Sequence, residues 1–117
     1  MKVLILDDEK FDLFVVKKLV GLEFEAEGFT VPQEALDWAR ANTFDVVIID
    51  YYLTTTVLAH HVLQQLRTFV THPFKAFVLT NYVDSQQVTE LKAAGFDAVI
   101  HKPFTLEYFK VQLGLTP

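Results

Sequence analysis

Carboxylates follow two apolar segments of the sequence, at the points where these segments become polar. Asp7 and Asp8 come directly after Val3–Leu6, and Asp50 follows Val46–Ile49. A short run that is apolar at every position is typical of a strand buried on both faces of a parallel sheet. Ligands of such sheets bind in the crevice at the carboxyl ends of the strands. We therefore expect these carboxylates to converge on one pocket.

A hydroxyl group and an ammonium group are expected at the same edge. Thr80 ends the apolar run Phe77–Leu79, and Lys102 follows a run from Asp97 to Ile100. Because converging carboxylates repel one another, the pocket needs a divalent cation and a lysine to offset their charge. Oxygen ligands in a chain without cysteine favour Mg²⁺ over Zn²⁺, and Mg²⁺ binds carboxylates together with phosphate oxygens. These residues predict a magnesium-dependent pocket that takes up a phosphoryl group.

A purely structural interpretation of the same residues stays open at this point. Asp7 and Asp8 could equally form the N-cap of a helix that begins at Lys10. An acidic residue that closes a strand, such as Asp50, is common by itself. The joint occurrence of such residues at several strand ends is what favours a functional site.

The elements that would position these residues alternate between strands and helices. Strands are expected at Val3–Leu6, Phe24–Phe29, Val46–Ile49, Phe77–Leu79 and Asp97–Ile100. Helices are expected over Lys10–Val20, from Pro32, from Leu58 to Val70, between Asp84 and Gly95, and from Leu106 to Leu113. In the second strand Glu25 and Glu27 alternate with apolar residues, which indicates an edge strand. The alternation predicts an α/β fold, a parallel sheet with helices on both faces.

Size and composition exclude several classes of protein. The 117 residues suit one domain over residues 1–117, and 51% hydrophobic residues are enough for a core. The absence of cysteine excludes a disulfide framework, a thiolate metal site and a cysteine nucleophile. A net charge of −5 without a basic stripe makes nucleic acid a poor partner. No apolar run approaches the about 20 residues of a membrane span, and no signal-peptide pattern is seen, so we expect a cytoplasmic protein.

Taken in order, the motifs resemble the receiver domain of bacterial response regulators. The matching segments are Leu6–Glu9, Ile48–Asp50, Val78–Thr80 and His101–Phe104, and the resemblance extends from Val3 to about Leu113. It implies a flavodoxin-like, doubly wound sheet of five parallel strands in the order 2-1-3-4-5. That strand order is an expectation from the resemblance, because the sequence pattern alone does not fix it.

The resemblance also implies a role for each acidic residue. Asp50 would accept the phosphoryl group. Asp8 and Asp50 would bind Mg²⁺ through their carboxylates, Asp7 would act mainly through a bound water, and the backbone carbonyl of Tyr52 would complete the protein ligands. The implied cofactor is therefore Mg²⁺.

The remaining matched residues would serve the transfer itself. Lys102 would pair with one phosphoryl oxygen and Thr80 would hydrogen-bond another, and the Lys102–Pro103 peptide is expected to be cis. The donor would be a histidine kinase or a phosphotransfer protein, and the added charge would switch a partner-binding surface. The chain would thus be a signalling domain rather than an enzyme, with an unknown output partner. A homodimer through the fourth and fifth strands and the last helix is a further possibility.

The route from the pocket to the surface departs from the family pattern. Val99 stands three residues before Lys102, where receivers usually carry an aromatic residue that swings inward on activation. His101, Phe104 and Tyr82 are alternative candidates for reporting the phosphorylated state.

The surroundings of Asp50 also depart from the pattern. Thr54 and Leu58 stand where receivers commonly have a proline and a glycine. Tyr52 and Tyr82 flank the presumed reaction path, and we hypothesise that they shield the acyl phosphate from water. Asn81 replaces a small residue and is placed to narrow access or to contact the phosphoryl group.

Three other functions are compatible with an α/β fold. A flavodoxin-like cofactor binder would need a Ser/Thr/Gly loop after the first strand, where this chain has Asp7 and Asp8. A phosphohydrolase with an aspartate nucleophile would need an acidic residue where Tyr52 stands. A receiver-like interaction module that is never phosphorylated is supported by Val99 and the altered loop. It is opposed by the intact Asp7, Asp8, Asp50, Thr80 and Lys102. The sequence leaves open whether the chain stands alone or belongs to a longer regulator.

Overall fold

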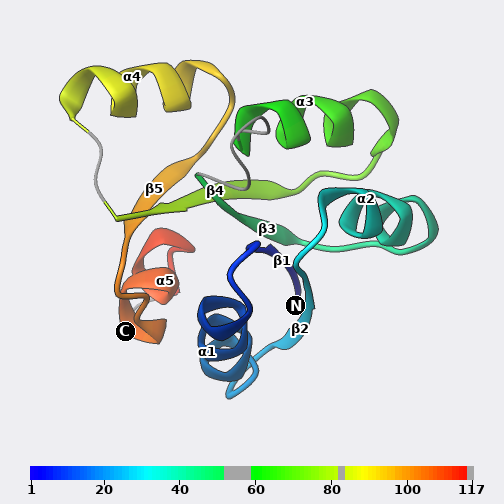
Figure 1. The fold of residues 1–117 in the computed structure, drawn as a ribbon, viewed down its shortest axis with the longest axis horizontal. Coiled ribbons are helices and arrows are strands. Elements are labelled where there is room, and N and C mark those ends of the chain that lie inside the picture. Colours follow the sequence, from blue (N-terminus) through cyan, green and yellow to red (C-terminus); the bar gives the residue numbers. More distant parts are fainter. Residues whose placement is uncertain (52–58, 82–83, 116–117) are drawn as a thin grey trace.

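Strands and helices alternate along the chain in this computed structural model, which describes residues 1–51, 59–81 and 84–115. The strands are β1 (Lys2–Leu6), β2 (Glu25–Phe29), β3 (Val46–Asp50), β4 (Lys75–Thr80) and β5 (Ala98–His101). The helices are α1 (Lys10–Val20), α2 (Pro32–Ala41), α3 (Ala59–Phe69), α4 (Ser85–Ala93) and α5 (Leu106–Gln112), and Figure 1 shows the arrangement.

The strands form one parallel sheet in the order β2-β1-β3-β4-β5. This order confirms the doubly wound α/β fold that the resemblance implied. Strand β2 lies at an edge and none of its residues is fully buried, as its alternating glutamates predicted. Leu6 pairs with Ile49, and Asp50 pairs with Leu79, so the ends of the three central strands lie at one edge of the sheet.

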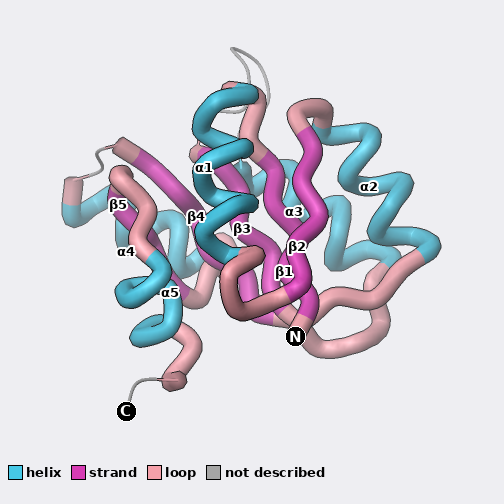
Figure 2. The backbone as a smooth tube through the Cα atoms, turned by 90° about the horizontal axis from the view of Figure 1, so that it is seen from below, coloured by secondary structure: helices cyan, strands magenta, loops and turns pink. Residues whose placement is uncertain are grey.

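Helices cover both faces of the sheet, and each face has its own core (Figure 1). Figure 2 looks onto the face that α1 and α5 cover. Successive side chains of a strand point to opposite faces, so Val46 and Ile48 pack toward α1 and α5 while Val47 and Ile49 pack toward α2 and α3. This two-sided burial is the reason that the central strands are apolar at every position.

The predicted helix signals are largely confirmed. Pro32 occupies the first turn of α2. Asp84 and Gln87 form a reciprocal capping box at the start of α4. In α3 the predicted Val62 and Leu66 are buried, whereas Val70 lies beyond the end of the helix.

Element boundaries differ from the predictions by one or two residues. Strand β4 begins at Lys75, ahead of the apolar run, because the Lys75 amide donates to the Asp45 carbonyl and continues the ladder. Strand β2 begins at Glu25 rather than Phe24. Apolar patterns mark where a strand is buried, while backbone pairing extends beyond the buried part. Of the helices that the structure describes, none has the length and apolar character needed to cross a membrane.

Candidate functional site

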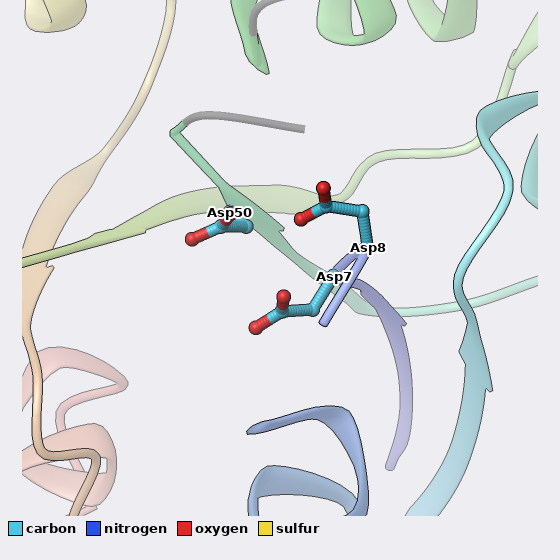
Figure 3. Close-up of side chains that lie close together, drawn as sticks. All are labelled: Asp7, Asp8 and Asp50. Atoms are coloured by element: carbon cyan, nitrogen blue, oxygen red, sulfur yellow. The ribbon is translucent and has the colours of Figure 1, made fainter. Parts of the chain in front are cut away.

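Three carboxylates lie together at the carboxyl edge of the sheet (Figure 3). Asp50 is the last residue of β3, and Asp7 and Asp8 follow β1 directly. One oxygen of each carboxylate lies within 4.8 Å of the other two. Asp7 and Asp50 are buried, with 1% and 7% of their surface exposed, and Asp8 is exposed. The parallel sheet therefore brings the three aspartates together as the sequence predicted.

Burial of Asp7 makes its negative charge costly. Its Oδ1 accepts a hydrogen bond from the Glu9 amide at 3.0 Å, while its Oδ2 is buried and accepts none from the residues that the structure describes. Desolvation raises the pKa of Asp7 to about 6, the Glu9 amide opposes this rise, and the charge of Asp50 adds to it. Together with the two neighbouring carboxylates, this carboxylate could hold a divalent cation.

The start of α1 does not use the two aspartates as caps. Glu9 is the N-cap residue, and its side chain accepts a hydrogen bond from the Phe11 amide at 3.3 Å. Capping therefore does not account for Asp7 and Asp8, whose carboxylates are grouped with that of Asp50 instead.

Lys102 brings a positive charge into the pocket. Its Nζ lies 3.1 Å from Asp50 Oδ1 and 3.9 Å from Asp7 Oδ2, and 17% of its side chain is exposed. Burial raises the pKa of Asp50, and its hydrogen bond and charge interaction with Lys102 oppose that rise. Burial lowers the pKa of Lys102, but hydrogen bonds to Asp12 and Asp50 outweigh this and raise it overall. Lys102 therefore remains an ammonium ion beside Asp50.

Thr80 and Lys102 are held side by side by the sheet. Thr80 ends β4, pairs with His101 and is buried, with 2% of its surface exposed. The Lys102 amide donates to the Thr80 carbonyl at 2.8 Å. The Lys102–Pro103 peptide is cis, as the resemblance implied.

Asp12 is a charged residue of the pocket that the sequence analysis did not identify. It lies in the first turn of α1, and its Oδ2 is 3.0 Å from Lys102 Nζ. A signal was present in the sequence, because Asp12, Val16 and Val20 are spaced four residues apart and share one face of the helix. Val16 and Val20 are buried against the sheet, so Asp12 lies at the end of the buried face of α1.

The residues that depart from the family pattern differ in their burial and in their position in the fold. Val99 is buried and belongs to the core on the side of α2 and α3. Among the alternative reporters, His101 is exposed, and Phe104 is buried with its ring centroid 5.6 Å from that of Phe109. Asn81 is exposed at the end of β4. The predictions for Tyr52, Thr54, Leu58 and Tyr82 concern residues outside the described ranges.

Comparison with known proteins identifies the family. The family model of the response regulator receiver domain matches residues 3–113. The chain therefore belongs to the response regulator receiver domain family, a family of signalling domains. A search of curated protein sequences finds no match.

Solved structures share this fold at low sequence identity. A receiver domain protein from Clostridium thermocellum is 22% identical, with a TM-score of 0.83 over 97% of this chain and 90% of that one. A CheY-like receiver domain from Methylobacillus flagellatus is 23% identical, with a TM-score of 0.82 over 97% and 96% of the two chains.

A longer regulator also shares the fold. A response regulator from Burkholderia pseudomallei, solved with a phosphorylated aspartic acid, a calcium ion and citrate, is 20% identical with a TM-score of 0.83. The match covers 96% of this chain and 65% of the Burkholderia chain, so the present chain spans about two thirds of that regulator.

Proposed function

We propose that this domain accepts a phosphoryl group on Asp50, in a Mg²⁺-dependent transfer from the phosphohistidine of a histidine kinase or a phosphotransfer protein. The observation that carries this proposal is the setting of Asp50. Its carboxylate is nearly buried, is grouped with those of Asp7 and Asp8, and lies 3.1 Å from the ammonium group of Lys102. A candidate nucleophile, candidate metal ligands and a cation thus lie together.

The donor set fits Mg²⁺. Asp8 and Asp50 would hold the ion through carboxylate oxygens, and Asp7 would support it from one shell further out, with the Tyr52 carbonyl as a further ligand. Mg²⁺ usually keeps several waters and takes one or two carboxylates together with a phosphate oxygen, and the grouped carboxylates offer oxygen ligands of this kind. When bound, the metal supplies positive charge at the transferring oxygens.

The transfer follows from the positions of the protein groups. An oxygen of Asp50 attacks the phosphorus, an O–P bond forms as the P–N bond of the phosphohistidine breaks, and the electron pair leaves on the imidazole nitrogen. Lys102 offsets the charge on one phosphoryl oxygen, and the hydroxyl of Thr80 donates to another. The phosphoryl group of the product carries about two negative charges, where the Asp50 carboxylate carried one at the end of β3. That change would bias a surface toward a partner of the signalling pathway, in the cytoplasm.

Similar proteins support the proposal. The Burkholderia regulator is described with a phosphorylated aspartic acid and a calcium ion. A further structure of the same fold, 20% identical with a TM-score of 0.81, is described as a BeF3-activated receiver domain. These ligands are properties of those proteins, and together with the family they make phosphorylation the first function to test here.

Beryllofluoride binding tests the proposal directly, because the anion mimics a phosphoryl group on a carboxylate. The parent protein with Mg²⁺ is expected to bind it and to show shifted amide resonances around Asp50, Thr80 and Lys102. Asp50→Asn is expected to bind none, and Asp37→Asn, an exposed aspartate of α2, serves as the matched control. If the parent protein stays unchanged at saturating Mg²⁺, the proposal fails, and a receiver-like interaction module becomes the better interpretation.

A further inference from the structure

Lys102 is shared between two carboxylates that come from different elements. Its Nζ lies 3.0 Å from Asp12 Oδ2 on α1 and 3.1 Å from Asp50 Oδ1 at the end of β3. The contact with Asp12 is a hydrogen bond, and both contacts lie within ion-pair distance. The ammonium group therefore bridges the pocket and the first turn of α1.

The charge of Asp12 differs from the other acidic charges of the pocket. Among the described residues, the carboxylates grouped closely enough to hold one metal ion are Asp7, Asp8 and Asp50, and Asp12 does not belong to this group. A bound cation would offset the charges of those three directly, whereas Asp12 would keep Lys102 as its cationic partner. A phosphoryl group on Asp50 would be a further acceptor for the same ammonium group.

The surroundings leave both side chains room to separate. Asp12 and Lys102 line one cavity of about 400 Å³, whose wall includes Phe11, Val15 and Asn81. The Asp12 side chain is 39% exposed, so its carboxylate can turn into water, and 17% of the Lys102 side chain is exposed. Ion pairs with an exposed partner add little to stability, so this contact can be exchanged at small cost.

On this geometry we propose that Asp12 is a positioning residue that competes with the phosphoryl group for the Lys102 ammonium group, so that phosphoryl uptake exchanges the Asp12–Lys102 ion pair for a Lys102–phosphoryl contact. The inference rests on the proposed function and adds to it a specific competitor. It also gives the pocket a physical link to α1 that does not depend on Val99. Asp12 lies next to Phe11, which is 70% exposed, in the first turn of α1. Loss of the ion pair would therefore act on a part of the helix that lies at the protein surface.

Removal of the competing charge tests the inference. Asp12→Asn keeps the size of the side chain and is expected to bind beryllofluoride about two- to five-fold more tightly at saturating Mg²⁺, the range set by a weak ion pair. Asp12→Glu retains the charge and is expected to return most of the way to the parent affinity. Glu9→Gln removes one charge at the same end of α1 without touching Lys102, and the amide can still cap the helix, so it reports the general electrostatic effect.

A second readout follows Lys102 itself. In protein labelled with ¹³C-lysine, the side-chain signals of Lys102 are expected to shift when beryllofluoride binds to the parent. In unliganded Asp12→Asn they are expected to lie already displaced toward the bound position, because the ammonium group has lost its second partner. A merely structural effect of the substitution would not move these signals along the line that joins the free and bound states.

The outcomes separate the two proposals. If the parent binds beryllofluoride but Asp12→Asn binds no more tightly than Glu9→Gln, the role of Asp12 is overturned and the proposed function stands. If Asp12→Asn binds more weakly than the parent, Asp12 assists Lys102 rather than competing for it, and the inference is again overturned. If the parent itself binds no beryllofluoride, both proposals fall together.

Discussion

Replacement of Asp7 by asparagine is expected to stabilise the metal-free protein at neutral pH. The Asp7 carboxylate has 1% of its surface exposed, its Oδ2 has no hydrogen-bond donor among the described residues, and Asp50 stands nearby. At neutral pH this carboxylate must be ionised in a place that disfavours charge. Asparagine keeps an oxygen that can accept the hydrogen bond from the Glu9 amide, and it removes the charge. The folded state therefore becomes more stable relative to the unfolded state.

The size of this gain follows from the pKa. Burial raises the pKa of Asp7 from 3.8 to about 6. A shift of about two pH units corresponds to about 3 kcal/mol between the ionised and protonated forms. The side-chain amide that the substitution introduces needs partners of its own, so we expect a net gain of about 1–3 kcal/mol in the free energy of unfolding.

The sign of the effect depends on pH. The pKa of Asp7 is higher in the folded protein than in the unfolded chain, so proton binding at Asp7 favours the folded state. This contribution to the free energy of unfolding is fully present below pH 3.8 and is lost as the pH rises through about 6. The advantage of Asp7→Asn is therefore absent in acid and complete above about pH 7.

Urea denaturation from about pH 4 to about pH 8 in the presence of EDTA measures this advantage. Asp37→Asn, on the exposed face of α2, is the matched control and is expected to stay within about 0.5 kcal/mol of the parent at every pH. With saturating Mg²⁺ the order should reverse, because the parent gains the free energy of metal binding. An Asp7→Asn protein that is less stable than the parent without metal, by an amount independent of pH, would refute the reasoning.

Two further predictions concern the framework that positions the site. Phe109 is fully buried on the inner face of α5, so Phe109→Ala is expected to lower the free energy of unfolding, measured in urea, by about 3–5 kcal/mol. The neighbouring Tyr108 is 43% exposed, and Tyr108→Ala should lower it much less. Equal losses in the two variants would contradict this packing. Asp84→Ala removes the side-chain half of the capping box with Gln87 and should cost about 1 kcal/mol, measured by thermal unfolding against Ser85→Ala as control. An unchanged melting temperature would show that the capping box does not stabilise α4.

The fold and the central carboxylates could be predicted because their signals are local and strong. Val3–Leu6 and Val46–Ile49 are apolar at every position, which is typical of strands with two covered faces. Residues that end such strands share one edge of the sheet, so the sequence alone predicts that Asp7, Asp8 and Asp50 lie close together. The strand order came from the family resemblance, since apolar runs do not say which strands are neighbours.

Other parts of the site could not be predicted in the same way. The position of Asp12 could not be predicted, because apolar residues mark the buried face of a helix and a carboxylate that continues this face resembles an ordinary surface residue in the sequence. Whether Glu9 or Asp8 caps α1 depends on where the first turn begins, which sequence patterns locate only to within a residue or two. The position of Lys102 between Asp12 and Asp50 depends on tertiary packing and has no sequence signature.

The most direct test of the account is the mass of the intact protein after incubation with acetyl phosphate and Mg²⁺. We predict that the parent gains the mass of one phosphoryl group, that EDTA prevents this gain, and that Asp50→Asn gains nothing. Peptide analysis should place the group on Asp50. A parent protein whose mass is unchanged, or an Asp50→Asn protein that gains as much as the parent, would contradict the claim that Asp50 is the phosphoryl acceptor.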